Sequence, residues 1–195
     1  MMKRNNLFLI AGHNGAGKTT FLKEFVRVNK LKYINPDEIA QKISIDKFSL
    51  LTIKAGKITL KRIEKLKKEK EDFIVETTLS GKIWKTLISD FKKNNYHITL
   101  FFIYLDTPEE AIKRVAIRIN KKGHYVSKED IYRRYFRSIK NFWYIYKSLG
   151  DEWFLINNSG KIPYLIATGT KDKYQILDNE NFDKFLLIVK NKEGR

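Results

Sequence analysis

The sequence predicts an α/β fold, with a mostly parallel central sheet and helices on both of its faces. Short apolar runs alternate with longer amphipathic runs, which is the order of strands and helices in such a sheet. A glycine-rich turn joins the first apolar run to the first helical run. No Pro-, Gly- or Ser-rich linker divides the 195 residues, so we expect a single domain over residues 1–195.

The elements follow from the apolar pattern. The predicted strands cover residues 7–11, 32–35, 72–77, 98–105 and 153–157, and the predicted helices cover 18–28, 48–70, 82–94, 108–121 and 128–148. The tail has a different period. Residues 162–168 and 174–177 predict a small β-hairpin, and residues 181–190 predict a closing helix.

Composition limits the class of protein. Hydrophobic residues make up 43% of the chain, enough for one sizeable core, and no run approaches the roughly 20 apolar residues of a membrane helix. The formal net charge of +17 allows a nucleic-acid partner, but the lysines are spread along the whole chain, which favours a solvated surface. The absence of cysteine excludes disulfides and thiolate metal sites and suits a reducing cytoplasm. We expect a soluble, cytoplasmic protein with no membrane partner.

Residues 12–19, Gly-His-Asn-Gly-Ala-Gly-Lys-Thr, match the phosphate-binding P-loop in full. A predicted strand precedes them and a predicted helix follows. The glycines let backbone N–H groups turn toward phosphate oxygens, and the start of the helix adds its positive end. The chain is therefore predicted to be a P-loop NTPase. The predicted nucleotide-binding residues are Gly12, His13, Asn14, Gly15, Ala16, Gly17, Lys18, Thr19 and Thr20.

Two of these residues have specific predicted roles. Lys18 should reach the β- and γ-phosphates, and the hydroxyl of Thr19 should be a ligand of Mg²⁺. The chain lacks the Asn-Lys-x-Asp sequence with which GTPases read guanine. ATP is therefore the predicted nucleotide.

Two carboxylates follow predicted strands, at the sheet edge where α/β folds bind ligands. Asp37 is a candidate base that orients or deprotonates a hydroxyl attacking the γ-phosphate, and it is equally a candidate cap for a helix starting near Glu38. Glu76 ends the third strand. Its carboxylate is a candidate to hold a magnesium-bound water or a substrate hydroxyl, and the alternative is a solvated strand end.

Arginines occur in pairs four residues apart on two successive predicted helices. The pairs are Arg114 with Arg118 and Arg133 with Arg137, and Arg134 lies beside the second pair. Each pair projects from one helix face, and a basic turn at 121–124 separates the helices. This arrangement predicts a helical lid over about residues 108–148 that places arginines on the triphosphate. An exposed basic helical hairpin is the alternative.

Together these segments resemble the zeta-toxin-like kinases, in the branch described as predicted ABC-type ATPases. The resemblance is carried by residues 11–20, 35–40 (Asn-Pro-Asp-Glu-Ile-Ala), 76–81 (Glu-Thr-Thr-Leu-Ser-Gly), 114–118, 123–126, 131–138 and 157–160. The sequence departs from the family at His13, where many relatives have proline, and at residues 122–124, Lys-Gly-His, where the family has Gly-Gly-His.

The resemblance implies ATP and Mg²⁺ as cofactors and transfer of the γ-phosphoryl group to a hydroxyl. In the toxin relatives this hydroxyl belongs to the amino sugar of UDP-N-acetylglucosamine, and an antitoxin protein is a further implied partner. The family roles fall on Lys18, Thr19, Asp37 as base, Glu76 near substrate or metal, and Arg118 with Arg133 or Arg134 as lid cations. The leading hypothesis is a small-molecule kinase. A polynucleotide kinase and a nucleotide-binding switch or partner-binding module are the alternatives.

Overall fold

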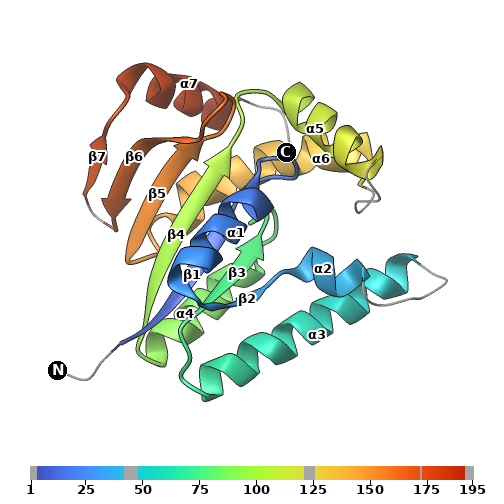
Figure 1. The fold of residues 1–195 in the computed structure, drawn as a ribbon. Coiled ribbons are helices and arrows are strands. Elements are labelled where there is room, and N and C mark those ends of the chain that lie inside the picture. The colour runs from blue at the N-terminus through green and yellow to red at the C-terminus, as the bar shows by residue number, and fades with distance from the viewer. Residues whose placement is uncertain (1–3, 42–47, 121–125, 172, 192–195) are drawn as a thin grey trace.

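The structure, a computed structural model, describes residues 4–41, 48–120, 126–171 and 173–191. Its centre is a seven-stranded sheet in the order β2-β3-β1-β4-β5-β6-β7 (Figure 1). The strands are β1 (Asn5–Ala11), β2 (Lys32–Ile34), β3 (Phe73–Thr77), β4 (Tyr96–Tyr104), β5 (Glu152–Asn157), β6 (Tyr164–Thr170) and β7 (Tyr174–Ile176). The first five strands in this order of the sheet are parallel, and β6 and β7 are antiparallel additions. The predicted α/β class is confirmed.

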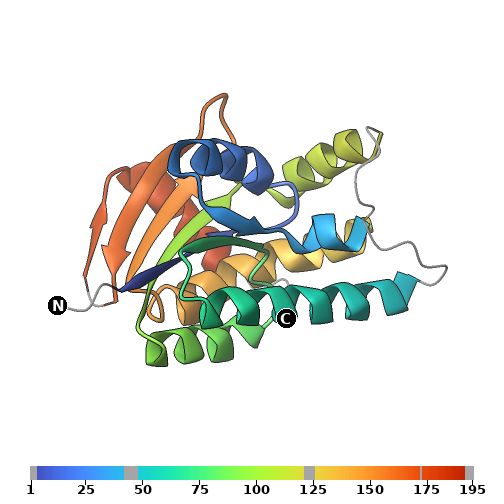
Figure 2. The same cartoon turned by 60° about the horizontal axis from the view of Figure 1, so that its bottom comes forward.

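Helices cover both faces of the sheet, as predicted (Figure 2). They are α1 (Lys18–Asn29), α2 (Pro36–Gln41), α3 (Phe48–Lys68), α4 (Ile83–Lys93), α5 (Pro108–Asn120), α6 (Lys128–Asn141), the π-helix η1 (Phe142–Tyr146) and α7 (Asn179–Lys190). One face packs on α1, through a small core that includes Leu22 and Ile10. The larger core on the other face joins the sheet to α3, α4, α6 and α7, and the rings of Phe102 and Phe142 stack within it at 4.3 Å.

The tail is part of the sheet. The predicted hairpin is confirmed as β6 and β7, and β6 also pairs antiparallel with β5, so that the hairpin extends the sheet. Gly169 permits this pairing, because a Cβ at that position would lie 2.8 Å from the ring of Trp153. The hairpin and α7 thus add to the side of the sheet away from β2.

Two further differences concern helices near the predicted site. A short helix, α2, begins at Pro36 directly after β2, two residues before the start near Glu38 that the cap alternative for Asp37 assumed. The predicted helix over 128–148 is regular only to Asn141, after which one π turn follows, with Lys147 N donating to Phe142 O at 2.9 Å. No helix within the described ranges is both long and apolar enough to cross a membrane.

Candidate functional site

The P-loop connects β1 to α1, and two of its glycines have conformations that no other residue fits. Gly12 has a φ of 143°, and a Cβ there would lie 2.0 Å from Ile103 O on the neighbouring strand. Gly17, with a φ of 92°, precedes the first turn of α1, and a Cβ there would lie 2.2 Å from Asn158 Nδ2. The loop therefore needs glycine for its curl and for the close approach of β4 and of the segment after β5.

Lys18, Thr19 and Glu76 meet where β3 ends beside the P-loop. Lys18 Nζ donates to His13 O at 2.9 Å and lies 3.8 Å from Glu76 Oε1. Thr19 Oγ1 donates to Glu76 Oε2 at 3.1 Å. Burial lowers the pKa of Lys18, and burial raises the pKa of Glu76 against the opposing effect of the Lys18 charge. Glu76 is therefore no solvated strand end.

These oxygens suit Mg²⁺. The ion prefers hard oxygen ligands and keeps several waters, so it is commonly held by one or two side chains together with the phosphates. The hydroxyl of Thr19 and the carboxylate of Glu76 already share a hydrogen bond, and both could turn to one ion. No larger group of three or more His, Asp or Glu side chains suited to a metal occurs in the part of the chain that the structure describes.

Asn35 ties the two predicted acidic residues together. Its Oδ1 accepts from Asp37 N at 2.9 Å and from Glu38 N at 3.4 Å, so Asn35 caps α2. Its Nδ2 donates to Glu76 Oε2 at 3.0 Å. The interpretation of Asp37 as the helix cap is therefore wrong, and its carboxylate lies in the first turn of α2. An Asn followed by Pro is a known start signal, which points to Asn35 as the cap from sequence alone.

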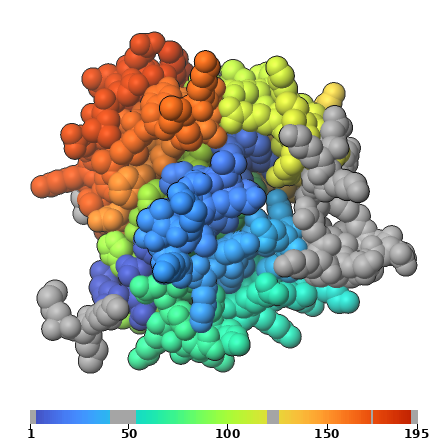
Figure 3. Space-filling view, in the orientation of Figure 1, coloured from blue at the N-terminus to red at the C-terminus, as the bar shows by residue number. Residues whose placement is uncertain are grey.

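Two cavities share the Lys18–Glu76 pair. The larger has a volume of about 520 Å³ and opens among α1, α5 and the segment before β6, which meet on one face of the molecule (Figure 3). It is lined by Gly15, Gly17, Lys18, Thr19, Thr20, Phe21, Glu24, Glu76, Ile103, Arg114, Val115, Arg118, Asn158, Lys161 and Pro163. The smaller, of about 170 Å³, is lined by Lys18, Asn35, Pro36, Asp37, Glu76, Thr77, Thr78 and Arg134. The pair thus forms a common wall.

The structure separates the predicted lid arginines. Arg118 of α5 lines the larger cavity, and Arg134 of α6 lines the smaller one. Arg133 lines neither cavity, and its exposed guanidinium bonds to Asp130 Oδ1 at 2.6 Å. Arg114 donates to Asn158 O at 2.7 Å and lines the larger cavity. The predicted basic turn at 121–124 lies outside the described residues.

His13 lies behind the P-loop and is fully buried. Its Nε2 accepts from Leu105 N at 3.0 Å, so the proton is on Nδ1, which donates to Asn14 O at 2.8 Å. Burial lowers its pKa to about 3, which keeps the ring neutral. The ring of Tyr135 of α6 packs at a tilt against this ring, with centroids 4.6 Å apart, and its hydroxyl donates to Leu105 O at 2.9 Å. His13 therefore supports the loop through its side chain and offers phosphate only its backbone.

The profile of the Zeta toxin family matches residues 2–149. The chain belongs to the Zeta toxin family. An uncharacterized protein of Haemophilus influenzae is 27% identical over 132 residues, which cover 68% of this chain and 94% of that protein. The resemblance that the motifs predict is confirmed.

Solved structures with this fold include toxin–antitoxin proteins. The PezAT toxin–antitoxin system of Streptococcus pneumoniae matches with a TM-score of 0.62 and 14% identity, covering 98% of this chain and 89% of that one. The AvrRxo1-ORF1:AvrRxo1-ORF2 complex with ATP matches with a TM-score of 0.77 and 14% identity, covering 100% and 67%. With sulphate ions that complex gives a TM-score of 0.75 at 15% identity over 94% of this chain, which spans only 64% of the other.

The likeness extends to a metabolic kinase. Shikimate kinase from Bacteroides thetaiotaomicron has a TM-score of 0.53 and 15% identity, covering 82% of this chain and 89% of that one. At such identities the likeness concerns the fold, and the fold of this Zeta toxin family chain is that of the P-loop kinases.

Proposed function

We propose that this protein is an ATP-dependent small-molecule kinase that transfers the γ-phosphoryl group to a substrate hydroxyl. The observation that carries the proposal is the Lys18–Glu76 pair, which forms the common wall of the two cavities. The larger cavity contains the P-loop and is assigned to ATP. The smaller contains Asp37 and is assigned to the acceptor, with the amino sugar of UDP-N-acetylglucosamine as the first acceptor to test.

The proposed reaction uses groups that already face this wall. Lys18 exchanges His13 O for the β- and γ-phosphates, so its charge meets the phosphoryl group in transfer. Asp37 takes the proton of the acceptor hydroxyl while the oxygen of that hydroxyl bonds to the γ-phosphorus. The bond from that phosphorus to the bridging oxygen breaks, and ADP leaves with the electron pair. Arg118 and Arg134, one from each cavity, balance the charge on the phosphoryl oxygens.

Mg²⁺ would neutralise charge on the β- and γ-phosphates when bound. Thr19 and Glu76 are the residues that would hold it, since their oxygens lie together at the wall. Asn35 keeps the Glu76 carboxylate in place from the other side.

We further propose that the chain acts as a single domain and that an antitoxin protein is its partner. The partner proposal rests on family membership and on the toxin–antitoxin system among the structures of the same fold. An antitoxin that covers the cavities would keep both substrates out.

The test is transfer from γ-labelled ATP with Mg²⁺ to UDP-N-acetylglucosamine and, in parallel, to a metabolite extract and to RNA. Wild type is compared with Lys18→Ala and Asp37→Asn. Label on the sugar nucleotide that both substitutions abolish would support the reaction and both roles. Label only on another metabolite replaces the acceptor, and label only on RNA favours a polynucleotide kinase. ATP binding without transfer to any pool rejects the kinase in favour of a nucleotide-binding switch.

A further inference from the structure

The loop that follows β3 carries a strained residue. Leu79 has a φ of 52°, in the left-handed region that leucine rarely adopts, and its side chain is buried in the core. Such strain persists only where surrounding contacts hold it, and it gathers at ligand sites. Thr77 and Thr78, directly before Leu79, line the smaller cavity. The conformation of Leu79 therefore sets one wall of the pocket assigned to the acceptor.

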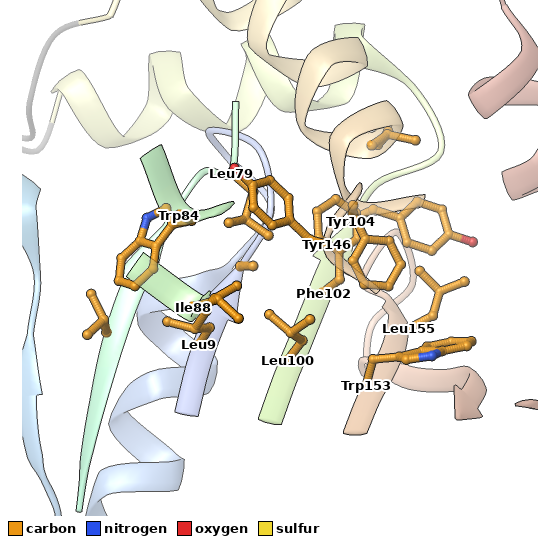
Figure 4. Packing of buried hydrophobic residues seen from close by; sticks show 14 of the residues in the cluster. Leu9, Leu79, Trp84, Ile88, Leu100, Phe102, Tyr104, Tyr146, Trp153 and Leu155 are labelled. Atoms are coloured by element: carbon orange, nitrogen blue, oxygen red, sulfur yellow. The ribbon is translucent and has the colours of Figure 1, made fainter. Parts of the chain in front are cut away.

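Two side chains from one helical run hold this loop. At the end of α6, Asn141 Nδ2 donates to Leu79 O at 2.8 Å. In η1, Tyr146 Oη donates to Gly81 O at 2.6 Å, and Figure 4 shows the hydroxyl directed toward the segment that carries Leu79. From within the loop, Leu79 N donates to Thr77 Oγ1 at 3.2 Å. The strained residue is thus fixed at its own carbonyl, at its own N–H, and two residues further on.

The turn that carries Tyr146 is itself unusual. η1 is a single π turn, and π turns insert an extra residue into a helix, often at functional sites. Burial raises the pKa of Tyr146 to about 12, so its hydroxyl keeps the proton that it donates. The same helical run carries Arg134, which lines the smaller cavity. One helical run, α6 with η1, therefore both holds the loop at residues 77–81 and carries Arg134.

We propose that Asn141 and Tyr146 are positioning residues of the acceptor pocket, which hold residues 77–81 in the strained conformation that shapes its wall. In assigning this pocket to the acceptor, the inference rests on the proposed function. Neither side chain lines either cavity, so each acts through the carbonyl that it binds. The loss of either hydrogen bond lets the loop relax from the left-handed conformation at Leu79 and displaces Thr77 and Thr78.

The test measures the initial rate of phosphoryl transfer at a series of acceptor concentrations and a series of ATP concentrations. The proteins compared are wild type, Asn141→Ala, Tyr146→Phe and Tyr96→Phe. The acceptor is UDP-N-acetylglucosamine, or the metabolite that the wild type phosphorylates in an extract. Tyr96→Phe is the matched control, because Tyr96 is equally buried and its Oη donates to Glu71 O at 3.0 Å. Glu71 precedes the first residue of β3, at the end of the strand away from the cavities.

We expect Asn141→Ala and Tyr146→Phe to raise the KM for the acceptor about tenfold, the effect of one lost hydrogen bond at a positioned wall, with the KM for ATP within about twofold of wild type. Tyr96→Phe should lower the thermal midpoint as Tyr146→Phe does and leave both KM values unchanged. Equal effects of Tyr146→Phe and Tyr96→Phe on the acceptor KM, or an equal rise in the KM for ATP, would overturn the proposal.

A second measurement keeps the two proposals separate. If the wild type phosphorylates no acceptor, the proposed function fails. Amide hydrogen exchange then tests the clamp alone, that is, the hydrogen bonds by which Asn141 and Tyr146 hold residues 79 and 81. Exchange across residues 78–81 should be about tenfold faster in Tyr146→Phe than in wild type, with no change across the P-loop. Unchanged exchange across residues 78–81 would show that the hydroxyl does not hold the loop.

Discussion

The Asn35 amide donates a hydrogen bond of 3.0 Å to the Glu76 carboxylate, and both side chains are buried at the common wall of the two cavities. The same amide group, through its oxygen, caps the helix that carries Asp37. One side chain thereby sets the positions of both carboxylates to which the proposed reaction assigns chemistry.

The first prediction separates these two duties. Asn35→Ala should lower the free energy of unfolding by about 2–4 kcal/mol, because a helix cap is lost and a buried carboxylate loses a donor. Asn35→Asp keeps a cap for α2 but places a second carboxylate against buried Glu76, so it should be at least as unstable as Asn35→Ala and recover none of the activity. We expect both variants to lower kcat about a hundredfold. Urea unfolding and steady-state rates test this, with Asn94→Ala, at the exposed end of α4, as the control.

The second prediction uses two neighbouring arginines as a matched pair. Arg134→Ala should lower kcat by about a hundredfold or more, because a cation is removed from the cavity assigned to the acceptor. Arg133→Ala removes only an exposed ion pair with Asp130, worth about 0–1 kcal/mol, and should leave kcat within about twofold. Equal losses in the two variants would mean that α6 turns during catalysis to present a different face.

The third prediction concerns Mg²⁺. Glu76→Gln keeps an oxygen that can accept from Thr19 and Asn35 but removes the charge, so the half-saturating concentration of Mg²⁺ should rise about tenfold. Titration of the transfer rate with Mg²⁺ at fixed ATP measures it. Glu71→Gln, which alters an exposed pair with Lys32 at the other end of β3, should leave the titration unchanged. An unaltered titration in Glu76→Gln would remove Glu76 from the metal site.

The fourth prediction is a pH dependence from His13. Its folded pKa of about 3 lies below the unfolded value of 6.5, so below pH 6.5 the unfolded chain binds a proton that the folded chain cannot. Stability should therefore fall by about 1.4 kcal/mol per pH unit as the pH drops from 6.5 toward 3. His13→Gln has no such proton, so its unfolding free energy should fall less steeply between pH 6.5 and 4.5. Parallel curves for the two proteins would contradict the buried, neutral ring.

Local patterns predicted much of this fold. The P-loop, the five parallel strands and most helices follow from apolar periodicity and from glycine spacing, which act over a few residues. The π turn of η1 did not follow, because it depends on how Phe142 and Tyr146 pack against elements distant in sequence. The pairing of β6 with β5 likewise depends on a contact between Gly169 and Trp153 that no local pattern contains.

The site shows the same division. Lys18, Thr19, Asp37 and Glu76 were candidates from motif and strand position. The structure places Lys18 and Glu76 in the common wall, Thr19 in the larger cavity and Asp37 in the smaller one. Arg133 and Arg134 could not be distinguished, because neighbours on a helix differ by about 100° in direction and only the packing of α6 decides which faces inward. The clamp by Asn141 and Tyr146 was also missed, since it joins segments more than sixty residues apart.

The Lys18–Glu76 wall would couple binding in one cavity to binding in the other. Lys18 donates to His13 O and lies 3.8 Å from Glu76 Oε1, so a triphosphate that binds Lys18 competes with both groups. A phosphate that takes Lys18 would leave Glu76 without its cation, and a ligand that moves Glu76 would leave Lys18 without its anion. Such linkage is reciprocal by thermodynamic necessity, so whatever factor ATP applies to acceptor binding, the acceptor applies to ATP. An inhibitor of one cavity would likewise change affinity in the other, by a factor that belongs to that inhibitor and its partner ligand and is the same in both directions.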